Sequence, residues 1–159
     1  MESPALWSRI IVDTDNWPLT DKAVISRNLG LLSTSLTRSG SHPLDVDIII
    51  GSPLQEDWHS ASTKTVALLS EHGHRWRTLF LWCATPSYIK IMELARGKLN
   101  SLVKLELVVS RISLWHSESA APTDIFLDCP SLRKVIFCGD SKYIPALPAA
   151  QLSSFFVFL

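Results

Sequence analysis

One apolar phrase recurs along this chain with the same spacing. In its clearest copy, the segment 99–109, the apolar positions are Leu99, Leu102, Leu105 and Leu107, and charged residues alternate with the last two. That alternation predicts a strand with its leucines on one face and its charges on the other. Because the same order returns elsewhere, the phrase favours repeated units over a single buried strand. The other copies are Trp76-x-x-Leu79-x-Leu81, Leu132-x-x-Val135-x-Phe137 and Leu152-x-x-Phe155-x-Val157.

Around these copies, strand-like and helix-like patterns follow one another. Short runs in which apolar and polar residues alternate predict strands, whereas apolar residues spaced three or four apart predict helices. Strands are predicted at 6–13, 44–50, 78–82, 99–109, 134–138 and 154–158, and helices at 21–38 and 60–72.

The predicted helices have recognisable ends. Thr20 is the expected N-cap of the first helix, and Gly40 follows its last turn. Ser60 or Ser62 is the expected N-cap of the second helix, with Gly73 at its C′ position. A third helix is also predicted, with Thr85 as cap, Pro86 in the first turn, and Tyr88, Met92 and Ala95 on the inner side.

Each strand is followed by one helix or turn, which is the pattern of a repeating unit. A single strand–helix unit would leave an apolar side of its strand and of its helix exposed to water. Neighbouring units are therefore expected to stack in parallel and bury these sides. We therefore predict an α/β fold, a leucine-rich-repeat-like solenoid of parallel strands with helices on the outer face. Residues 1–159 form one domain in this prediction, with 1–5 as a leader remnant. A doubly wound α/β sheet is the alternative, but no Gly-rich turn follows any predicted strand.

Composition narrows the classes of function. An apolar fraction of 47% with 19% charged residues excludes a disordered chain. The formal net charge is zero, whereas a general nucleic-acid binder carries a basic excess, so no nucleic-acid partner is expected. No signal peptide or apolar run of membrane-spanning length is present, and no membrane contact is predicted. The chain has three cysteines, Cys83, Cys129 and Cys138, which lie far apart in the sequence. An odd number at such spacing does not indicate a disulfide framework, and it fits a cytoplasmic or nuclear location.

Candidate reaction chemistry is weak in this sequence. His72 and His74 with Cys83 could form a metal site or a cysteine nucleophile with its base, but the spacing matches neither pattern. The structural interpretation is that the histidines lie at a helix C-terminus, where the dipole favours them. Cys129 and Cys138 are interpreted as small buried hydrophobic residues. We predict no catalytic residue, no metal and no cofactor.

One face of the predicted strands carries the candidate binding residues. Asp45 and Asp47 alternate with buried positions; they could hold a cation or act as an acid–base pair, but the solvent side of a strand explains them better. Phe80 and Trp82 alternate with leucines that are expected to be buried. They either serve as aromatic anchors for a protein partner or are covered by a loop or by missing segments. The predicted partner-binding residues are Asp45, Asp47, Phe80, Trp82, Lys104, Glu106, Lys134 and Ile136, with Phe156 and Phe158 further along the same face.

The order of several phrases resembles a known family. LWSRIIVD, LTRSGSHPLDVDI, LLSEHGHRWRTLFL, LNSLVKLELVV, DCPSLRKVIFCG and LPAAQLSSFF are similar to the region downstream of the F-box in fungal F-box proteins of the leucine-rich-repeat type. The resemblance runs from Leu6 nearly to the end of the chain. It implies a protein-interaction module that holds the substrate of a Skp1–cullin–F-box ubiquitin ligase, and no enzymatic activity of its own.

The resemblance does not include the F-box itself. Only five residues precede Leu6, where the family has the module that binds Skp1, so Skp1 binding and ligase membership stay open. The segment FFVFL ends the chain without a polar capping unit. We therefore expect a truncated chain, or a paralogue or gene product without the F-box. A ligase-independent adaptor and a small α/β enzyme are the alternative functions.

Overall fold

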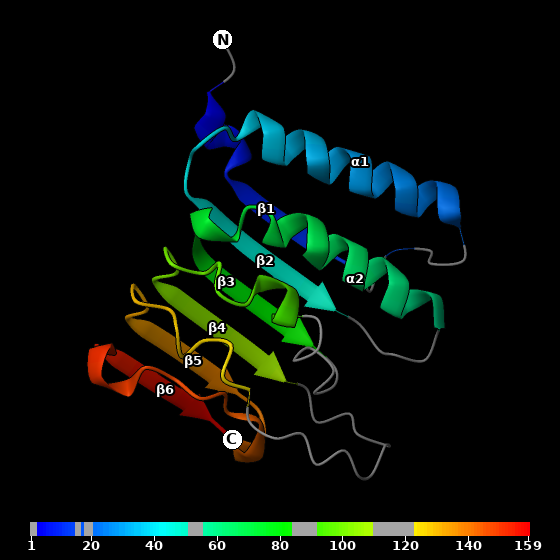
Figure 1. The fold of residues 1–159 in the computed structure, drawn as a ribbon. Coiled ribbons are helices and arrows are strands. Elements are labelled where there is room, and N and C mark those ends of the chain that lie inside the picture. Colours follow the sequence, from blue (N-terminus) through cyan, green and yellow to red (C-terminus); the bar gives the residue numbers. More distant parts are fainter. Residues whose placement is uncertain (1–2, 15–16, 18–20, 51–55, 84–91, 110–122) are drawn as a thin grey trace.

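The computed structural model describes residues 3–14, 17, 21–50, 56–83, 92–109 and 123–159, with side chains in the range 56–60 left aside. Within these ranges there are six strands and two α-helices; one helix follows each of the first two strands along the chain (Figure 1). The elements are β1 (Arg9–Asp13), α1 (Lys22–Arg38), β2 (Leu44–Ile50), α2 (Glu56–Ser70), β3 (Trp76–Cys83), β4 (Lys104–Val109), β5 (Lys134–Cys138) and β6 (Ser154–Phe158).

The strands form one sheet whose order follows the chain, from β1 to β6. Every neighbouring pair is parallel. This confirms the α/β class and the prediction that 78–82, 104–108 and 134–138 run side by side in one direction. The order never reverses along the sheet, so the arrangement is not doubly wound. The sheet is open, with β1 and β6 as its edges.

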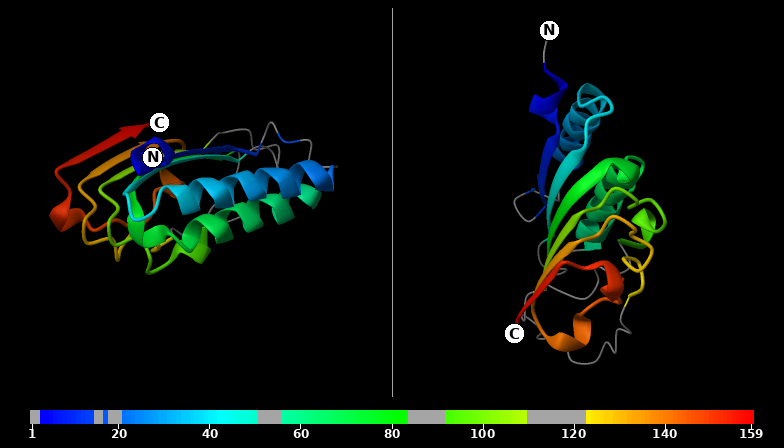
Figure 2. Two further views of the ribbon diagram at one scale, coloured as in Figure 1. Left: turned by 90° about the horizontal axis from the view of Figure 1, so that it is seen from above. Right: turned by 90° about the vertical axis from the view of Figure 1, so that its left-hand side faces the viewer.

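The core lies between the sheet and the helices. Both α1 and α2 cover the same side of the sheet (Figure 2). The strand residues that face this side align in register across β1 to β5, and each is at most 4% exposed. Trp76, Val66 and Leu69 are also completely buried. The aligned ladders are Ile10, Val46, Leu79, Leu105 and Val135, followed by Val12, Ile48, Leu81, Leu107 and Phe137.

The first helix begins one residue later than predicted. Asp21 is the N-cap, because its carboxylate accepts hydrogen bonds from the backbone N–H groups of Ala23 at 2.9 Å and Val24 at 3.3 Å. Thr20, the predicted cap, lies outside the described residues. Gly40 follows the helix with φ of 56°, as the predicted end requires.

The termini of the second helix were predicted wrongly. Because α2 starts at Glu56, Ser60 and Ser62 are interior residues and not caps. The Ser62 hydroxyl is buried 3.5 Å from that of Thr14. The helix ends at Ser70, and Gly73 opens a short 3-10 turn instead of occupying the C′ position. Glycine is needed there because an added Cβ would lie 2.9 Å from the Cβ of Lys98.

The predicted third helix falls mainly outside the described residues, which exclude Thr85, Pro86 and Tyr88. Met92 and Ala95 are buried as predicted, and a 3-10 turn spans Glu93–Ala95.

The last copy of the apolar phrase departs from the others. Phe155 and Val157 occupy the core-facing register of β6, yet they are 45% and 38% exposed. Periodicity selects the side of the sheet that a residue faces, but burial also needs neighbours. In the described chain β6 pairs only with β5, and neither α-helix reaches it (Figure 2).

Candidate protein-binding face

The side of the sheet opposite α1 and α2 is called the open face. Its residues alternate with the core ladders, and strand register aligns them in three rows. From the amino ends to the carboxyl ends of the strands, the rows are Arg9, Asp45, Thr78, Lys104, Lys134 and Ser154; Ile11, Asp47, Phe80, Glu106, Ile136 and Phe156; and Asp13, Ile49, Trp82, Val108, Cys138 and Phe158.

All eight predicted binding residues belong to these rows. Seven of them are partly exposed, and Lys134 is exposed. The open face is therefore charged in the first row, mixed in the second and largely apolar in the third.

A hollow of about 360 Å³ lies on this face, over β2, β3 and β4. Of the predicted residues, Asp47, Phe80, Lys104 and Glu106 line it, whereas Asp45, Trp82, Lys134 and Ile136 do not. The remaining lining residues are Arg9, Thr78 and Leu79. An aromatic ring with charges of both signs around it can hold an apolar side chain and hydrogen-bond to polar groups beside it.

Two arginines neutralise the aspartates of β2. Arg77 holds Asp45 through two contacts, from Nη2 to Oδ2 at 2.8 Å and from Nε to Oδ1 at 3.2 Å. The Thr78 hydroxyl donates to the same Oδ1 at 2.9 Å. Asp47 accepts from Arg9 Nη2 at 3.2 Å. The aspartates therefore lie on the partly solvated side of the strand, as the structural interpretation predicted.

The pKa of Asp45 reflects these contacts. Partial burial raises it, but the hydrogen bonds from Arg77 and Thr78 outweigh burial and leave the pKa below its ordinary value. Asp45 is therefore ionised at neutral pH and is not a general acid there.

Charges on β4 and β5 differ in their pairing. Lys104 Nζ lies 3.0 Å from Glu106 Oε2 on the same strand. Lys134 Nζ lies 5.8 Å from the centre of the Phe156 ring, a cation–π contact. In the described part of the chain, no carboxylate forms an ion pair with Lys134.

The prediction that Cys138 is buried was wrong. The side chain is exposed, not buried, because Cys138 has the open-face register between Val108 and Phe158. Cys129 is buried as predicted, and none of the three cysteines, all of which are described, forms a disulfide.

The structure separates the residues of the cysteine–histidine alternative. His72 precedes β3, and Cys83 is its last residue, so the strand puts roughly 23 Å between its two ends. Cys83 is buried, with Sγ 3.7 Å from the carbonyl oxygen of Val108. Within the described ranges, no three His, Cys, Asp or Glu side chains gather as metal ligands would.

Three residues important to this face were missed. Arg9 and Thr78 line the hollow and Arg77 pairs with Asp45. Arg9 could have been placed on the open face, because it alternates with Ile10 and Val12. Arg77 could not, because it is an extra residue where the register between β2 and β3 shifts.

The fold and this face define an α/β protein with an open parallel sheet, helices on one side and a mixed apolar and charged surface on the other. Comparisons with family models, curated proteins and solved structures gave no match to this chain. Among the described helices, none combines the length and apolar character needed to cross a membrane.

Proposed function

We propose that this chain is a non-enzymatic protein-interaction module, a leucine-rich-repeat-like solenoid that binds another protein through its open face. The supporting observation is the set of half-buried aromatic and aliphatic side chains on that face, where neither α-helix packs. A sheet side of this kind with helices only on the other side is the arrangement expected of stacked strand–helix units.

The distribution of chemistry supports a protein partner. Phe80 lies at the hollow and Trp82 follows in the apolar row, and large aromatic residues supply much of the binding energy in protein interfaces. Ion pairs lie beside them toward the amino ends of the strands, including Arg77 with Asp45 and Lys104 with Glu106. Charged groups next to an apolar patch are typical of an interface and its rim.

The resemblance to fungal F-box proteins adds a more specific proposal. In this more specific proposal, the open face holds a protein that a Skp1–cullin–F-box ligase ubiquitinates. A ligase-independent adaptor would use the same face but would not be bound to Skp1 and cullin.

The test begins with the chain as bait in a lysate of its own organism. A protein that it retains is then purified, and its dissociation constant is measured for the wild type and the F80A/W82A double variant. We expect the double variant to bind at least about tenfold more weakly, a loss of about 1.4 kcal/mol. Arg27→Ala, an exposed position on α1, is the matched control and should bind as the wild type does.

Two outcomes decide the proposal. A double variant that unfolds cooperatively like the wild type yet binds equally well would overturn the role of the open face. Recovery of Skp1 and cullin with the chain would support the ligase receptor, whereas their absence beside another specific partner would support the adaptor.

A further inference from the structure

We propose that copies of this chain associate head to tail, with the outer edge of β6 in one copy pairing in parallel with the outer edge of β1 in the next. The proposal is independent of the proposed function, because this joint uses the sheet edges and leaves the open face accessible.

The two edge strands offer complementary surfaces. In the described chain, β1 pairs only with β2, and β6 pairs only with β5. The β6 edge presents five consecutive apolar residues, 155–159, each between 38% and 76% exposed. An uncharged edge strand of this kind is a template for a further strand.

Backbone hydrogen bonds fix which groups face outward. Asp45 N–H donates to Ser8 O and Thr14 N–H to Ile49 O, both at 2.9 Å, so the even-numbered residues of the β1 segment face β2. Because direction alternates along a strand, Ile11 directs its N–H and C=O to the outer edge.

The same reasoning applies to β6. Gly139 N–H donates to Phe158 O at 2.9 Å and Ser154 N–H to Arg133 O at 3.2 Å, so these residues face β5. Phe155 and Val157 therefore direct their backbone groups outward. In a parallel pairing, Phe155 would lie beside Ile10 of the next copy and Val157 beside Val12. The outward N–H and C=O groups of Phe155 and Val157 would then each find a backbone partner on β1. The same pairing continues the two core ladders into the next copy.

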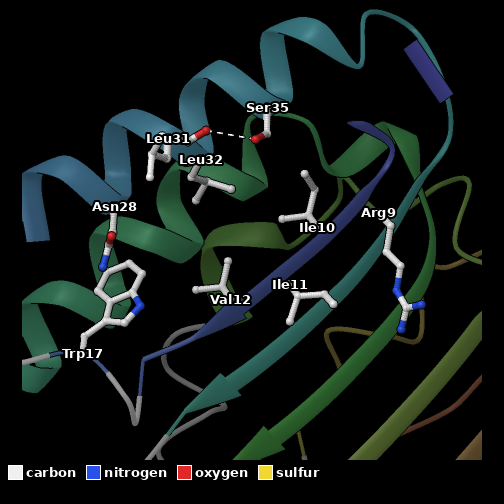
Figure 3. Close-up of a pocket in the computed structure, with 9 residues that line it drawn as sticks. All are labelled: Arg9, Ile10, Ile11, Val12, Trp17, Asn28, Leu31, Leu32 and Ser35. Atoms are coloured by element: carbon white, nitrogen blue, oxygen red, sulfur yellow. Dashed lines mark hydrogen bonds between the residues drawn. The ribbon is translucent and has the colours of Figure 1, made fainter. Parts of the chain in front are cut away.

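A second observation is that the β1 edge has room for side chains of β6. A hollow of about 300 Å³ opens between β1 and α1 (Figure 3). Ile10, Val12 and Leu32 contribute to its apolar wall, and Leu31 is 57% exposed at its rim. Since a cavity of about 150 Å³ accommodates benzene, this hollow has room for a phenylalanine ring and a smaller side chain. In the pairing above, Phe155 and Val157 face the same side of the sheet as Ile10 and Val12.

The joint is heterologous, since it joins two different edges. Each copy keeps one unused edge, so association continues beyond a dimer unless the ring closes. Pairing of two β6 edges instead would stop at a dimer and leave the hollow beside β1 empty.

Edge-blocking prolines test this arrangement. Ile11→Pro and Val157→Pro each remove one outward N–H and leave the pairing with the neighbouring strand intact. In sedimentation velocity, the wild type should grow beyond a dimer as its concentration rises, and each variant alone should stay monomeric. An equimolar mixture should form a heterodimer and nothing larger, because only one compatible pair of edges remains.

A second pair of variants, Leu31→Lys and Val157→Lys, places a charge at the joint without changing the backbone. Thermal unfolding checks that all variants fold. A wild type that stays monomeric at every concentration would overturn the proposal. So would a dimer of the Ile11→Pro variant, or a mixture that gives no heterodimer.

Discussion

Arg77 and Asp45 face each other across β3 and β2 as a two-point ion pair, with Nη2 to Oδ2 at 2.8 Å and Nε to Oδ1 at 3.2 Å. Arg77 reaches this position because the register between the two strands shifts there, which leaves it as an extra residue beside the aspartate. The pair fixes a carboxylate at the amino end of the open face.

The first prediction concerns the energy of this pair. The side chains of Arg77 and Asp45 are 57% and 32% exposed, so solvent screens the attraction. A double-mutant cycle with Arg77→Ala and Asp45→Ala in urea denaturation should give a coupling of about 0.5–1 kcal/mol. The single contact of Arg9 with Asp47 should give less, and a coupling above about 2 kcal/mol would contradict this account.

The second prediction concerns Arg75, which joins the end of α1 to the turn before β3. Its guanidinium is largely buried and donates to Ser39 Oγ at 2.7 Å and to the His42 carbonyl at 2.8 Å and 3.0 Å. Arg75→Ala leaves these oxygens without their donor, and we expect it to lower the free energy of unfolding by about 2–3 kcal/mol.

Arg133→Ala is the matched control for Arg75. Arg133 also donates to two backbone carbonyls, those of Pro130 and Leu132, but it is exposed, so water can replace it. Denaturant titration should show a change below about 0.5 kcal/mol for this variant. Equal losses for the two arginines would refute the role assigned to Arg75.

The third prediction concerns acid stability. Burial lowers the pKa of His72 below its ordinary value, and the nearby charge of Arg75 adds to the shift, although Glu71 opposes it. The unfolded chain therefore binds more protons than the folded chain between the lowered pKa and about 6.5, so stability falls as the pH drops through this window. Replacement by His72→Gln should flatten the decline measured from about pH 7.5 to 5.5; an unchanged slope would contradict the assignment.

The fourth prediction concerns thiol reactivity. Cys138 is exposed, whereas Cys83 and Cys129 are buried, and burial raises the pKa of Cys129 to about 12, with repulsion from Asp128 adding to the shift. Since the thiolate is the reactive form, Ellman's reagent should titrate one thiol rapidly in the native chain and all three in urea. The fast phase should disappear in Cys138→Ser; its survival would show that another cysteine is accessible.

The sequence predicts sidedness well because sidedness depends only on local alternation. Leu105 and Leu107 were assigned to one face of a strand from their spacing, and both are buried. The same periodicity placed all eight candidate residues on one face, Phe80 among them, because strand register keeps alternate residues together.

What sequence reasoning missed depends on long-range packing. Spacing could not show that Phe155 lacks a helix above it. Cys138 is a different case, because alternation with Phe137 does place it on the side of Ile136, and its assignment as a buried residue went against that pattern. The network of Arg75 joins residues 33 and 36 positions apart, and no local pattern reports such contacts. The hollow of the open face likewise gathers Arg9 and Lys104 from distant strands.

The most direct test of the open face uses Cys138, a natural reporter beside Val108 in its apolar row. The protein retained by the chain is added at saturation, and the rate of maleimide labelling is followed. The account predicts slower labelling of Cys138, with no change for a thiol introduced on α1 by Arg27→Cys in a Cys138→Ser background. Unchanged labelling of Cys138 together with protection of the α1 thiol would contradict it.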